Sequence, residues 1–266
     1  MRPLVSIIMP ARNTATWVGQ AVLSVRAQTF QNWELLVVDD ASTDQTSDLA
    51  RKAAGCDHGR RVHITRLAAH VGAAVARNWA IERAAGRWIA FLDSDDLWTP
   101  RKLERMLDFA TQTCGRLIFH SYGLIDARGN SLGLKLSAPT TVDYSTVLYD
   151  CVLGCSTAMY DVYFFGKVYM PDLRMRHDHA LWLELLKRID RAHGLDEVLA
   201  YYRVRKDSLS AKKHLAALWQ WKLYRTPSAA GLRLPDAIFL FAKYAVCHIF
   251  KKRYHPLALE NRIPAI

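Results

Sequence analysis

The first hundred residues alternate between short apolar runs and longer helical patterns, and this alternation constrains the fold more than any other feature. Four runs have the length of strands: VSIIM (5–9), ELLVV (34–38), VHITRL (62–67) and WIAFL (88–92). The segments between them are TATWVGQAVLSVRAQ, TDQTSDLARKAA and AAVARNWAIERAAG. Runs that are apolar throughout are typical of parallel strands buried on both faces. The sequence therefore predicts successive βαβ units with right-handed crossovers in an α/β fold.

Polar clusters follow three of these runs directly. PARN follows the first run, DDASTD the second and DSDD the fourth. In open α/β sheets, ligands bind outside the carboxyl ends of the strands, so the clusters predict a crevice of the nucleotide-binding type. No glycine-rich phosphate loop follows the first run, which argues against a dinucleotide fold and against a P-loop.

The stretch FLDSDD, residues 91–96, brings three carboxylates close together: Asp93, Asp95 and Asp96. Like charges at this spacing raise the cost of ionising one another unless a cation or several hydrogen-bond donors lie among them. The other interpretation is a turn that leads into a helix, with Thr99 as the N-cap and Pro100 at the first helical position. Three carboxylates after a buried strand favour a divalent metal site.

With 266 residues, of which 51% are hydrophobic, the chain can form a substantial core. Its five cysteines are odd in number and include no CxxC pair, so we expect buried, reduced thiols rather than disulfides or a zinc site. The start, MRPLVSIIMPARN, does not have the pattern of a signal peptide, and we expect a cytoplasmic protein.

Later segments give further expectations. RLIFHSYGLID followed by DARGNSLG predicts a strand and a hairpin turn. HALWLELLKRI (179–189) predicts an amphipathic helix with Leu181, Leu185 and Ile189 on one face.

The positive charge of the chain lies in its last part. Residues 201–266 contain 13 Lys and Arg against 3 Asp and Glu, whereas the preceding residues are nearly balanced. Within this part, LPDAIFLFAKYAVCHIFKKR (234–253) predicts a helix that is too short in its apolar stretch to span a bilayer. Two interpretations stay open: an interfacial helix on an anionic membrane, or a helix that packs on the core.

With SIIMPARN, VVDDASTDQT, GAAVARNWAI and FLDSDDLW in this order, the sequence resembles family-2 glycosyltransferases of the GT-A fold over roughly residues 3–210. The resemblance implies an α/β, Rossmann-like, mostly parallel mixed sheet flanked by helices. It implies a catalytic domain at 1–210, with a nucleotide-sugar half at about 1–112 and an acceptor half at about 113–210, and a basic helical extension at 211–266.

The activity that the resemblance implies is the transfer of a hexosyl or N-acetylhexosaminyl group from a nucleotide diphosphate with inversion. YMPDLRMRHDHALWLELLK and LAYYRVRKDSLS are most similar to bacterial enzymes that build cell-surface polysaccharides such as capsule or teichuronic acid.

The resemblance also implies the roles of single residues. It places at the nucleotide and its diphosphate Pro10, Ala11, Arg12, Asn13, Asp39, Asp40, Arg77, Asp93, Ser94, Arg203, Arg205 and Lys206. Asp40 would accept a hydrogen bond from the uracil ring. Asp95, with Asp93 beside it, would bind Mn²⁺ or Mg²⁺. Asp178 would be the base that deprotonates the acceptor, and it is also expected to cap the helix that follows.

The implied partners are a UDP-sugar donor, a glycan or lipid-linked acceptor and an anionic membrane surface that the tail contacts, with no nucleic acid. The implied location is the inner face of the bacterial cell membrane, with peripheral association. Two other functions stay open: a nucleotidyltransferase acting on a sugar phosphate and a non-enzymatic polyanion binder. The first would need a phosphate loop after the first strand, and the second leaves the carboxylates unexplained.

Overall fold

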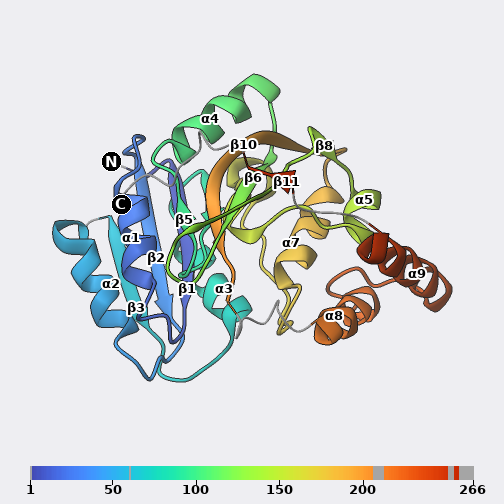
Figure 1. Ribbon diagram of the computed structural model, residues 1–266, viewed down its shortest axis with the longest axis horizontal. Helices are drawn as coiled ribbons and strands as arrows, with labels where there is room; N and C mark the ends of the chain where they lie inside the picture. The colour runs from blue at the N-terminus through green and yellow to red at the C-terminus, as the bar shows by residue number, and fades with distance from the viewer. Residues whose placement is uncertain (1, 60, 206–212, 251–254, 258–266) are drawn as a thin grey trace.

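The computed structural model describes residues 2–59, 61–205, 213–250 and 255–257, and its strands form one mixed sheet with helices on both faces (Figure 1). The strands are β1 (Val5–Ala11), β2 (Trp33–Asp39), β3 (Val62–Arg66), β4 (Trp88–Phe91), β5 (Leu97–Trp98), β6 (Leu117–Ile125), β7 (Ser131–Leu136), β8 (Thr141–Val142), β9 (Met159–Asp161), β10 (Ala192–Arg203) and β11 (His255–Pro256). The helices are α1 (Val18–Arg26), α2 (Thr46–Ala54), η1 (Gly55–Asp57), α3 (Ala73–Arg83), α4 (Lys102–Thr113), α5 (Tyr144–Tyr149), η2 (Cys155–Thr157), α6 (Val162–Phe165), α7 (His177–Leu186), α8 (Lys213–Arg225) and α9 (Leu234–Phe250).

The parallel part of the sheet is the one that the sequence predicts. β1 lies between β2 and β4, and β3 pairs with the outer edge of β2. The register sets Ala11 opposite Asp39 and Ile8 opposite Phe91, so β1, β2 and β4 end at the same edge of the sheet. The predicted βαβ units are confirmed, and their polar clusters come together where the strands end.

Antiparallel strands continue the same sheet. β9 pairs with both β4 and β6, and β6 and β7 form the predicted hairpin. The last long strand, β10, returns parallel to β6 and also pairs with the short strands β5 and β8. Strands of both predicted halves therefore share one continuous hydrogen-bonded sheet.

Side chains alternate across the sheet and supply two cores. Val5, Ile7 and Met9 face a core that α1, α2 and α4 cover. On the other face, Ile8 and Phe91 pack with residues of α3, α5 and α7. Because successive side chains of a strand point to opposite faces, an apolar strand needs cover on both sides, and the helices supply it.

Two helix boundaries differ from the predicted ones. Arg101 is the N-cap residue of α4, so neither Thr99 nor Pro100 has its predicted position. α7 ends at Leu186, which leaves Ile189 beyond the helix. The surroundings of α7 also differ from those of an amphipathic helix, which has one exposed face. α7 lies between the sheet and α5, so nearly its whole circumference is buried. On the side of the sheet, Trp182 meets Phe91 edge to face, with 5.6 Å between the ring centroids.

The five cysteines are free, as expected, but the expectation that they are buried is wrong. Cys56 and Cys114 are exposed, and the other three are partly exposed. Cys56 lies in the short helix η1 and Cys114 directly after α4, where neither side chain is covered by the core.

Two helices in the basic part of the chain, α8 and α9, pack against each other and the body. α9 contacts α5 and α8, with Phe241 edge to face against Trp221 at 5.7 Å between centroids. Ala237 and Tyr244 of α9 are buried. The core-packing interpretation of this helix therefore holds for one of its faces. No helix in the described ranges combines the length and the hydrophobicity that a bilayer span requires.

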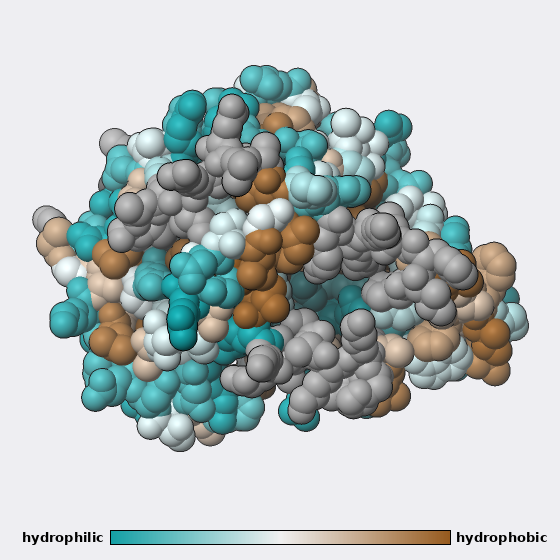
Figure 2. Space-filling view, viewed as in Figure 1, coloured by the Kyte–Doolittle hydropathy of each residue, from teal (hydrophilic) through white to brown (hydrophobic). Residues whose placement is uncertain are grey.

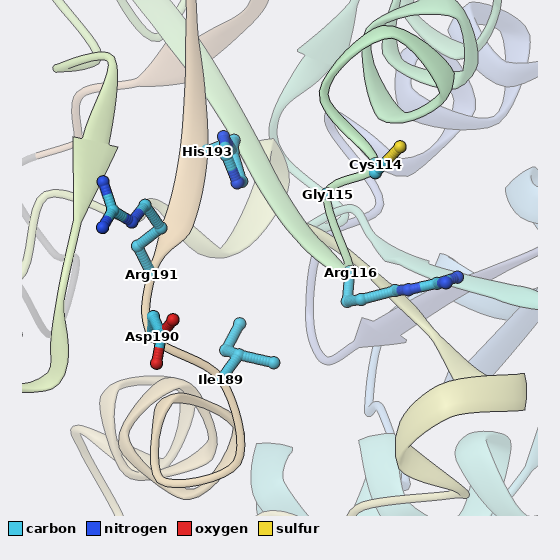
Figure 3. A pocket seen from close by; sticks show the side chains of 7 residues that line it. All are labelled: Cys114, Gly115, Arg116, Ile189, Asp190, Arg191 and His193. Atoms are coloured by element: carbon cyan, nitrogen blue, oxygen red, sulfur yellow. The ribbon is translucent and has the colours of Figure 1, made fainter.

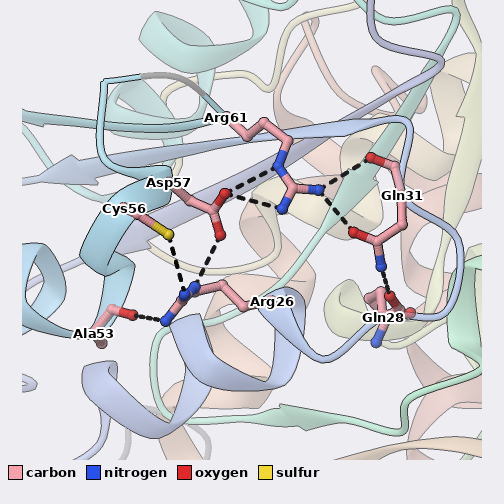
Figure 4. A network of polar contacts seen from close by, with 7 residues as sticks. All are labelled: Arg26, Gln28, Gln31, Ala53, Cys56, Asp57 and Arg61. Atoms are coloured by element: carbon pink, nitrogen blue, oxygen red, sulfur yellow. Dashed lines mark hydrogen bonds and ion pairs between the residues drawn. The ribbon is translucent and has the colours of Figure 1, made fainter.

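Polar contacts join the first helix to the start of β3 (Figure 4). Asp57 of η1 accepts from Arg26 Nε and from Arg61 Nη2, each at 2.9 Å. Arg61 also donates to the side chain of Gln31, and Arg26 to the carbonyl of Ala53. One carboxylate thus links α1, α2 and β3 on the side of the sheet remote from its carboxyl edge.

We expect Lys102→Met to raise the free energy of unfolding by about 1–3 kcal/mol at neutral pH, because a buried amine without hydrogen bonds is replaced by a thioether of similar shape. Lys102 is fully buried, and its Nζ lies 3.5 Å from the centroid of the Trp98 ring without a hydrogen-bond partner among the described residues. Burial holds the pKa of Lys102 well below its ordinary value.

The unfolded chain then binds more protons than the folded one, so the stability of the natural chain should rise as pH increases from neutral toward about 10. Urea denaturation at several pH values measures both effects. A methionine variant less stable than the natural chain at pH 7 would contradict this account.

Candidate functional site

The residues that follow β1 and β2 form one wall of the site. Arg12, which is exposed, donates from Nη1 to the backbone carbonyl of Asp40 at 2.8 Å. Asn13 accepts from Thr43 N at 2.8 Å and donates its own backbone N–H to Ser42 Oγ at 2.9 Å. Pro10 and Ala11 end β1 beside them. The sequence-predicted residues of the first two clusters therefore do lie together.

The two aspartates of this wall are buried and bound within the chain. Asp39 accepts from Ser42 N at 2.9 Å and from the hydroxyl of Ser47, which fixes the start of α2. Asp40 accepts from His70 Nδ1 at 2.7 Å. The contacts of Asp39 with Ser42 and Ser47 therefore stabilise the loop between β2 and α2.

Asp40 also organises the loop before α3. Its carboxylate accepts from the backbone N–H groups of Val71 at 2.7 Å and Gly72 at 2.9 Å. Gly72 has a φ of 92°, a conformation that favours glycine, and it is the N-cap residue of α3. The carboxylate thus holds the start of α3 at the carboxyl edge of the sheet.

The three carboxylates that follow β4 have different surroundings. Asp93 pairs with Arg77, and its side chain is 30% exposed. Asp95 pairs with Arg205 Nε at 2.9 Å, and its side chain is 18% exposed. Asp96 is buried, which raises its pKa together with the neighbouring negative charges. Two of the three therefore face the open side of the loop.

Asp96 binds the loop to the body of the protein. It accepts from Ser156 Oγ at 2.6 Å and from the backbone N–H of Arg203 at 2.9 Å. Ser156 Oγ in turn accepts from Asp93 N at 3.1 Å. Asp96 is therefore placed to orient the loop rather than to contact a ligand.

Arg203, predicted to meet the diphosphate, is buried behind the same loop. Its Nε donates to the carbonyl of Asp95 at 2.7 Å, and its Nη2 to Gln20 Oε1 at 2.9 Å. Nη1 donates to the carbonyls of Asp126 and Ala127 at 3.2 and 3.3 Å. Its guanidinium is directed into the chain, where it holds the loop, the β6–β7 turn and α1 together.

A buried guanidinium joins the carboxylate loop to α7. Arg77 is directed from α3 toward Asp93, and its Nη1 donates to His177 Nε2 at 2.6 Å. His177 Nδ1 lies 3.0 Å from the carbonyl of Leu173 and donates to it, because Nε2 acts as the acceptor. Burial and the charge of Arg77 lower the pKa of His177, so the imidazole is neutral at neutral pH.

Asp178 lies beside this pair in the first turn of α7. Arg176, with a φ of 66°, is the N-cap residue, so the prediction that Asp178 caps the helix is wrong. Burial acts to raise the pKa of Asp178, but the neighbouring His177 and Arg77 outweigh it, and the pKa lies below its ordinary value. Since His177 is neutral at neutral pH, Arg77 supplies the positive charge there.

Arg205 lies at the open side of the site. Besides its ion pair with Asp95, its guanidinium carbon is 4.6 Å from the centroid of the Trp17 ring. Ser94 is buried within the loop. Lys206, also predicted here, lies outside the described residues.

The predicted metal ligands, Asp93 and Asp95, have surroundings that can be compared with the needs of a divalent cation. In the part of the chain that the structure describes, no group of three or more His, Cys, Asp and Glu side chains is arranged to hold an ion. Mn²⁺ and Mg²⁺ can instead use one or two carboxylates together with substrate phosphates and water. Burial and the charge of Asp93 raise the pKa of Asp95. A cation bound between the two carboxylates would offset their repulsion. Asp93 and Asp95 therefore fit such an ion.

A pocket of about 400 Å³ lies elsewhere, between the end of α4 and the start of β10 (Figure 3). It is lined by Cys114, Gly115, Arg116, Ile189, Asp190, Arg191 and His193. These residues adjoin the amino ends of β6 and β10, opposite the carboxyl edge, and none of them is a sequence-predicted site residue.

Sequence reasoning missed the residues that hold the site together. Ser156, Gln20 and Trp17 carry no motif, and each meets its partner through long-range packing. His177 is next to the predicted base, but its partner Arg77 lies 100 positions earlier. In the sequence, only GAAVARNWAI, which contains Arg77, taken together with RHDHALW, which contains His177, could have indicated this contact.

The comparisons with known proteins identify a family. The model described as Glycosyl transferase family 2 matches residues 6–149. The chain is 40% identical over 244 residues to TuaG of Bacillus subtilis, a protein named as a teichuronic acid biosynthesis glycosyltransferase; the match covers 92% of this chain and 95% of TuaG. It is 34% identical to WfgD of Escherichia coli, named as a UDP-Glc:alpha-D-GlcNAc-diphosphoundecaprenol beta-1,3-glucosyltransferase, with 82% and 84% covered.

Solved structures show the same fold. TarS of S. aureus, residues 1–349 in complex with UDP-GlcNAc, superposes with a TM-score of 0.69 at 20% identity, over 94% of this chain and 74% of the other. The mannosyltransferase PcManGT of Pyrobaculum calidifontis, in complex with GDP-Man and Mn²⁺, gives 0.62 at 20% identity, with 95% and 77% covered. The predicted GT-A fold is confirmed.

The contact between Arg77 and His177 should appear as an energetic coupling. In a double-mutant cycle of Arg77→Met and His177→Leu, we expect a coupling energy of about 1 kcal/mol or more, because the two side chains share a buried hydrogen bond. Urea denaturation of the four proteins measures it. Arg83→Met, on the exposed end of α3, is the matched control and should couple to His177→Leu by less than about 0.5 kcal/mol. Equal coupling in both cycles would rule out a specific contact.

Proposed function

Because this chain belongs to glycosyl transferase family 2, we propose that it transfers a sugar from a UDP-sugar to a glycan or lipid-linked acceptor with inversion at the anomeric carbon. The observation that carries the proposal is the position of Arg77. It pairs with Asp93 of the carboxylate loop and with His177, the neighbour of Asp178. The diphosphate-binding end and the base are thereby held on the two sides of one guanidinium.

The base is Asp178. Its carboxylate is ionised at neutral pH, since the pKa is lowered, and it can accept the proton of an acceptor hydroxyl. As that proton leaves, the hydroxyl oxygen bonds to the anomeric carbon and the bond from this carbon to the diphosphate oxygen breaks. Arg77 keeps the carboxylate ionised but weakens it as a base, a compromise that suits a group required to be deprotonated before each turnover.

The donor end is formed by the carboxylate loop and the arginine beside it. Asp95 and Asp93 would hold Mn²⁺ or Mg²⁺, which neutralises charge on the departing diphosphate when bound. Arg205 lies beside Asp95 with its guanidinium near Trp17, where it can donate to phosphate oxygens. The proposal of a UDP-sugar is supported by TarS, solved with UDP-GlcNAc, and by WfgD, named for UDP-Glc.

The biological setting follows from the relatives. TuaG is named for teichuronic acid and WfgD for a diphosphoundecaprenol-linked acceptor. We therefore propose a role in bacterial cell-surface polysaccharide biosynthesis, on the cytoplasmic side of the membrane and in peripheral contact with it through the basic C-terminal part. The family match favours this function over a nucleotidyltransferase or a polyanion binder.

Asp95→Ala should abolish metal-dependent binding of UDP. Calorimetric titration of UDP with Mn²⁺ should show binding to the natural chain and a loss of at least about tenfold with EDTA or in the variant, because the loop then lacks a ligand for the cation. Asp108→Ala, which removes an exposed carboxylate from α4, is the matched control and should bind like the natural chain. UDP binding that is equally strong in Asp95→Ala would remove Asp95 from the metal site.

Asp178→Asn should separate chemistry from donor binding. We expect turnover of the UDP-sugar to fall by at least about 100-fold, because the amide cannot take the proton, while UDP affinity stays unchanged. The measurement is release of UDP in the presence of an acceptor extract, with UDP calorimetry on the same protein. Asp172→Asn, at an exposed position before α7, serves as the control. Turnover of Asp178→Asn within a fewfold of the natural chain would show that another group is the base.

A further inference from the structure

Helix α9 is apolar on two opposite faces. Its inner face packs on the body through buried Ala237 and Tyr244 and through the ring contact of Phe241 with Trp221. A surface helix normally opposes such a packed face with a polar one. α9 does not, so its outer face requires a separate explanation.

The outer face carries a row of exposed apolar side chains, which we call the outer stripe: Leu234, Ile238, Phe239, Ala242 and Val246. Ile238 and Val246 are each 55% exposed, and Phe239 is 70% exposed. At about 100° per residue these positions fall within one arc of the helix, opposite Ala237 and Tyr244. Figure 2 shows hydrophobic residues gathered at the end of the molecule that α9 forms in Figure 1. Contiguous apolar surface of this kind marks an interaction site.

The charges in the sequence of α8, α9 and the segment between them are almost all positive. Residues 213–250 contain five Lys and Arg and a single acidic residue, Asp236. Arg225 and Arg233 are exposed. Lys243 extends from the flank of the outer stripe to the ring of Tyr149, with 3.7 Å between Nζ and the ring centroid. Long basic side chains beside an apolar helix face are the arrangement of helices that lie in a membrane interface.

We propose that the outer stripe of α9 inserts into the interface of an anionic lipid bilayer. The positive charge of this part of the chain favours an anionic bilayer over a second copy of the chain as the partner of the outer stripe. Two copies meeting through their outer stripes would bring like charges together, whereas anionic headgroups complement them, at about 1 kcal/mol per basic residue near the surface.

The inner face of α9 connects the docked helix to the catalytic site. Arg176 Nη2 donates to the hydroxyl of Tyr244 at 3.2 Å, and its guanidinium carbon lies 5.9 Å from the centroid of the tyrosine ring. Arg176 is the N-cap residue of α7, two positions before Asp178. An α-helix with side chains is about 10–12 Å in diameter, so lipid at the outer stripe lies about one helix diameter from the residue that starts α7.

This geometry deepens the proposed function and rests on it. A base held so near the lipid surface suits an acceptor sugar that is itself attached to a lipid and stands a short distance above the headgroups. A soluble oligosaccharide acceptor would gain nothing from this placement.

The experiment is vesicle co-sedimentation of the full chain. The natural chain should bind vesicles of phosphatidylglycerol and phosphatidylcholine, and bind pure phosphatidylcholine much more weakly. The triple variant Ile238→Ser/Phe239→Ser/Val246→Ser should bind the anionic vesicles at least about tenfold more weakly, because three inserting side chains are lost. Tyr163→Ser, which removes a 68% exposed aromatic side chain from α6, is the matched control and should bind like the natural chain.

Two further measurements make the result decisive. UDP calorimetry on the same proteins reports the donor site independently, so its failure would count against the proposed function and leave the vesicle result standing. Light scattering after size exclusion reports a dimer.

The single variant Phe239→Ser repeats the vesicle test with the smallest change to the fold. It should bind the anionic vesicles about threefold or more weakly than the natural chain.

The proposal is overturned if the natural chain does not bind anionic vesicles. It is also overturned if the variants bind them as tightly as the natural chain does. A third contrary outcome is a natural dimer that the triple variant converts to a monomer without a change in vesicle binding.

Discussion

The candidate site of this protein depends on one buried cation. Arg77 has little contact with water, and burial alone would lower its pKa, but the carboxylates of Asp93 and Asp178 more than compensate and the guanidinium stays charged. A buried guanidinium is tolerated only where opposite charges and acceptors surround it. Supplying them draws the carboxylate loop, α3 and the start of α7 to one point. The relative position of the carboxylate loop and of Asp178, the proposed base, therefore follows from the solvation of a single side chain.

The carboxylate loop shows how one short segment serves several purposes. Asp96 is directed inward, to Ser156 and the backbone of Arg203, and so anchors the loop. Asp93 and Asp95 stay at the open side, each balanced by an arginine. Repulsion among the three carboxylates is thus reduced, because Asp96 is held inside the protein by hydrogen bonds and the other two are each paired with an arginine.

The sequence predicts most of the parallel sheet, because strands buried on both faces are apolar throughout and their polar ends stand out. It also predicts which clusters meet, since parallel strands end at one edge. Side-chain direction is harder to predict. The sequence predicts Arg203 at the diphosphate, but its guanidinium points behind the loop. The acceptors that it finds there are the carbonyl of Asp126 and the side chain of Gln20. The contact of Arg77 with His177 depends on packing across 100 positions, which local patterns do not encode.

The antiparallel insertion of β9 between β4 and β6 has a mechanical consequence. The hydrogen bonds of this strand join the part of the chain that carries the predicted nucleotide clusters to the part that carries α7 and the proposed base, so the two parts are linked in the middle of the described sheet. Opening a cleft by rotating one half against the other would require breaking the ladder in the middle of the sheet. We therefore expect the sheet to act as a rigid frame, with motion in the connecting segments at its carboxyl edge.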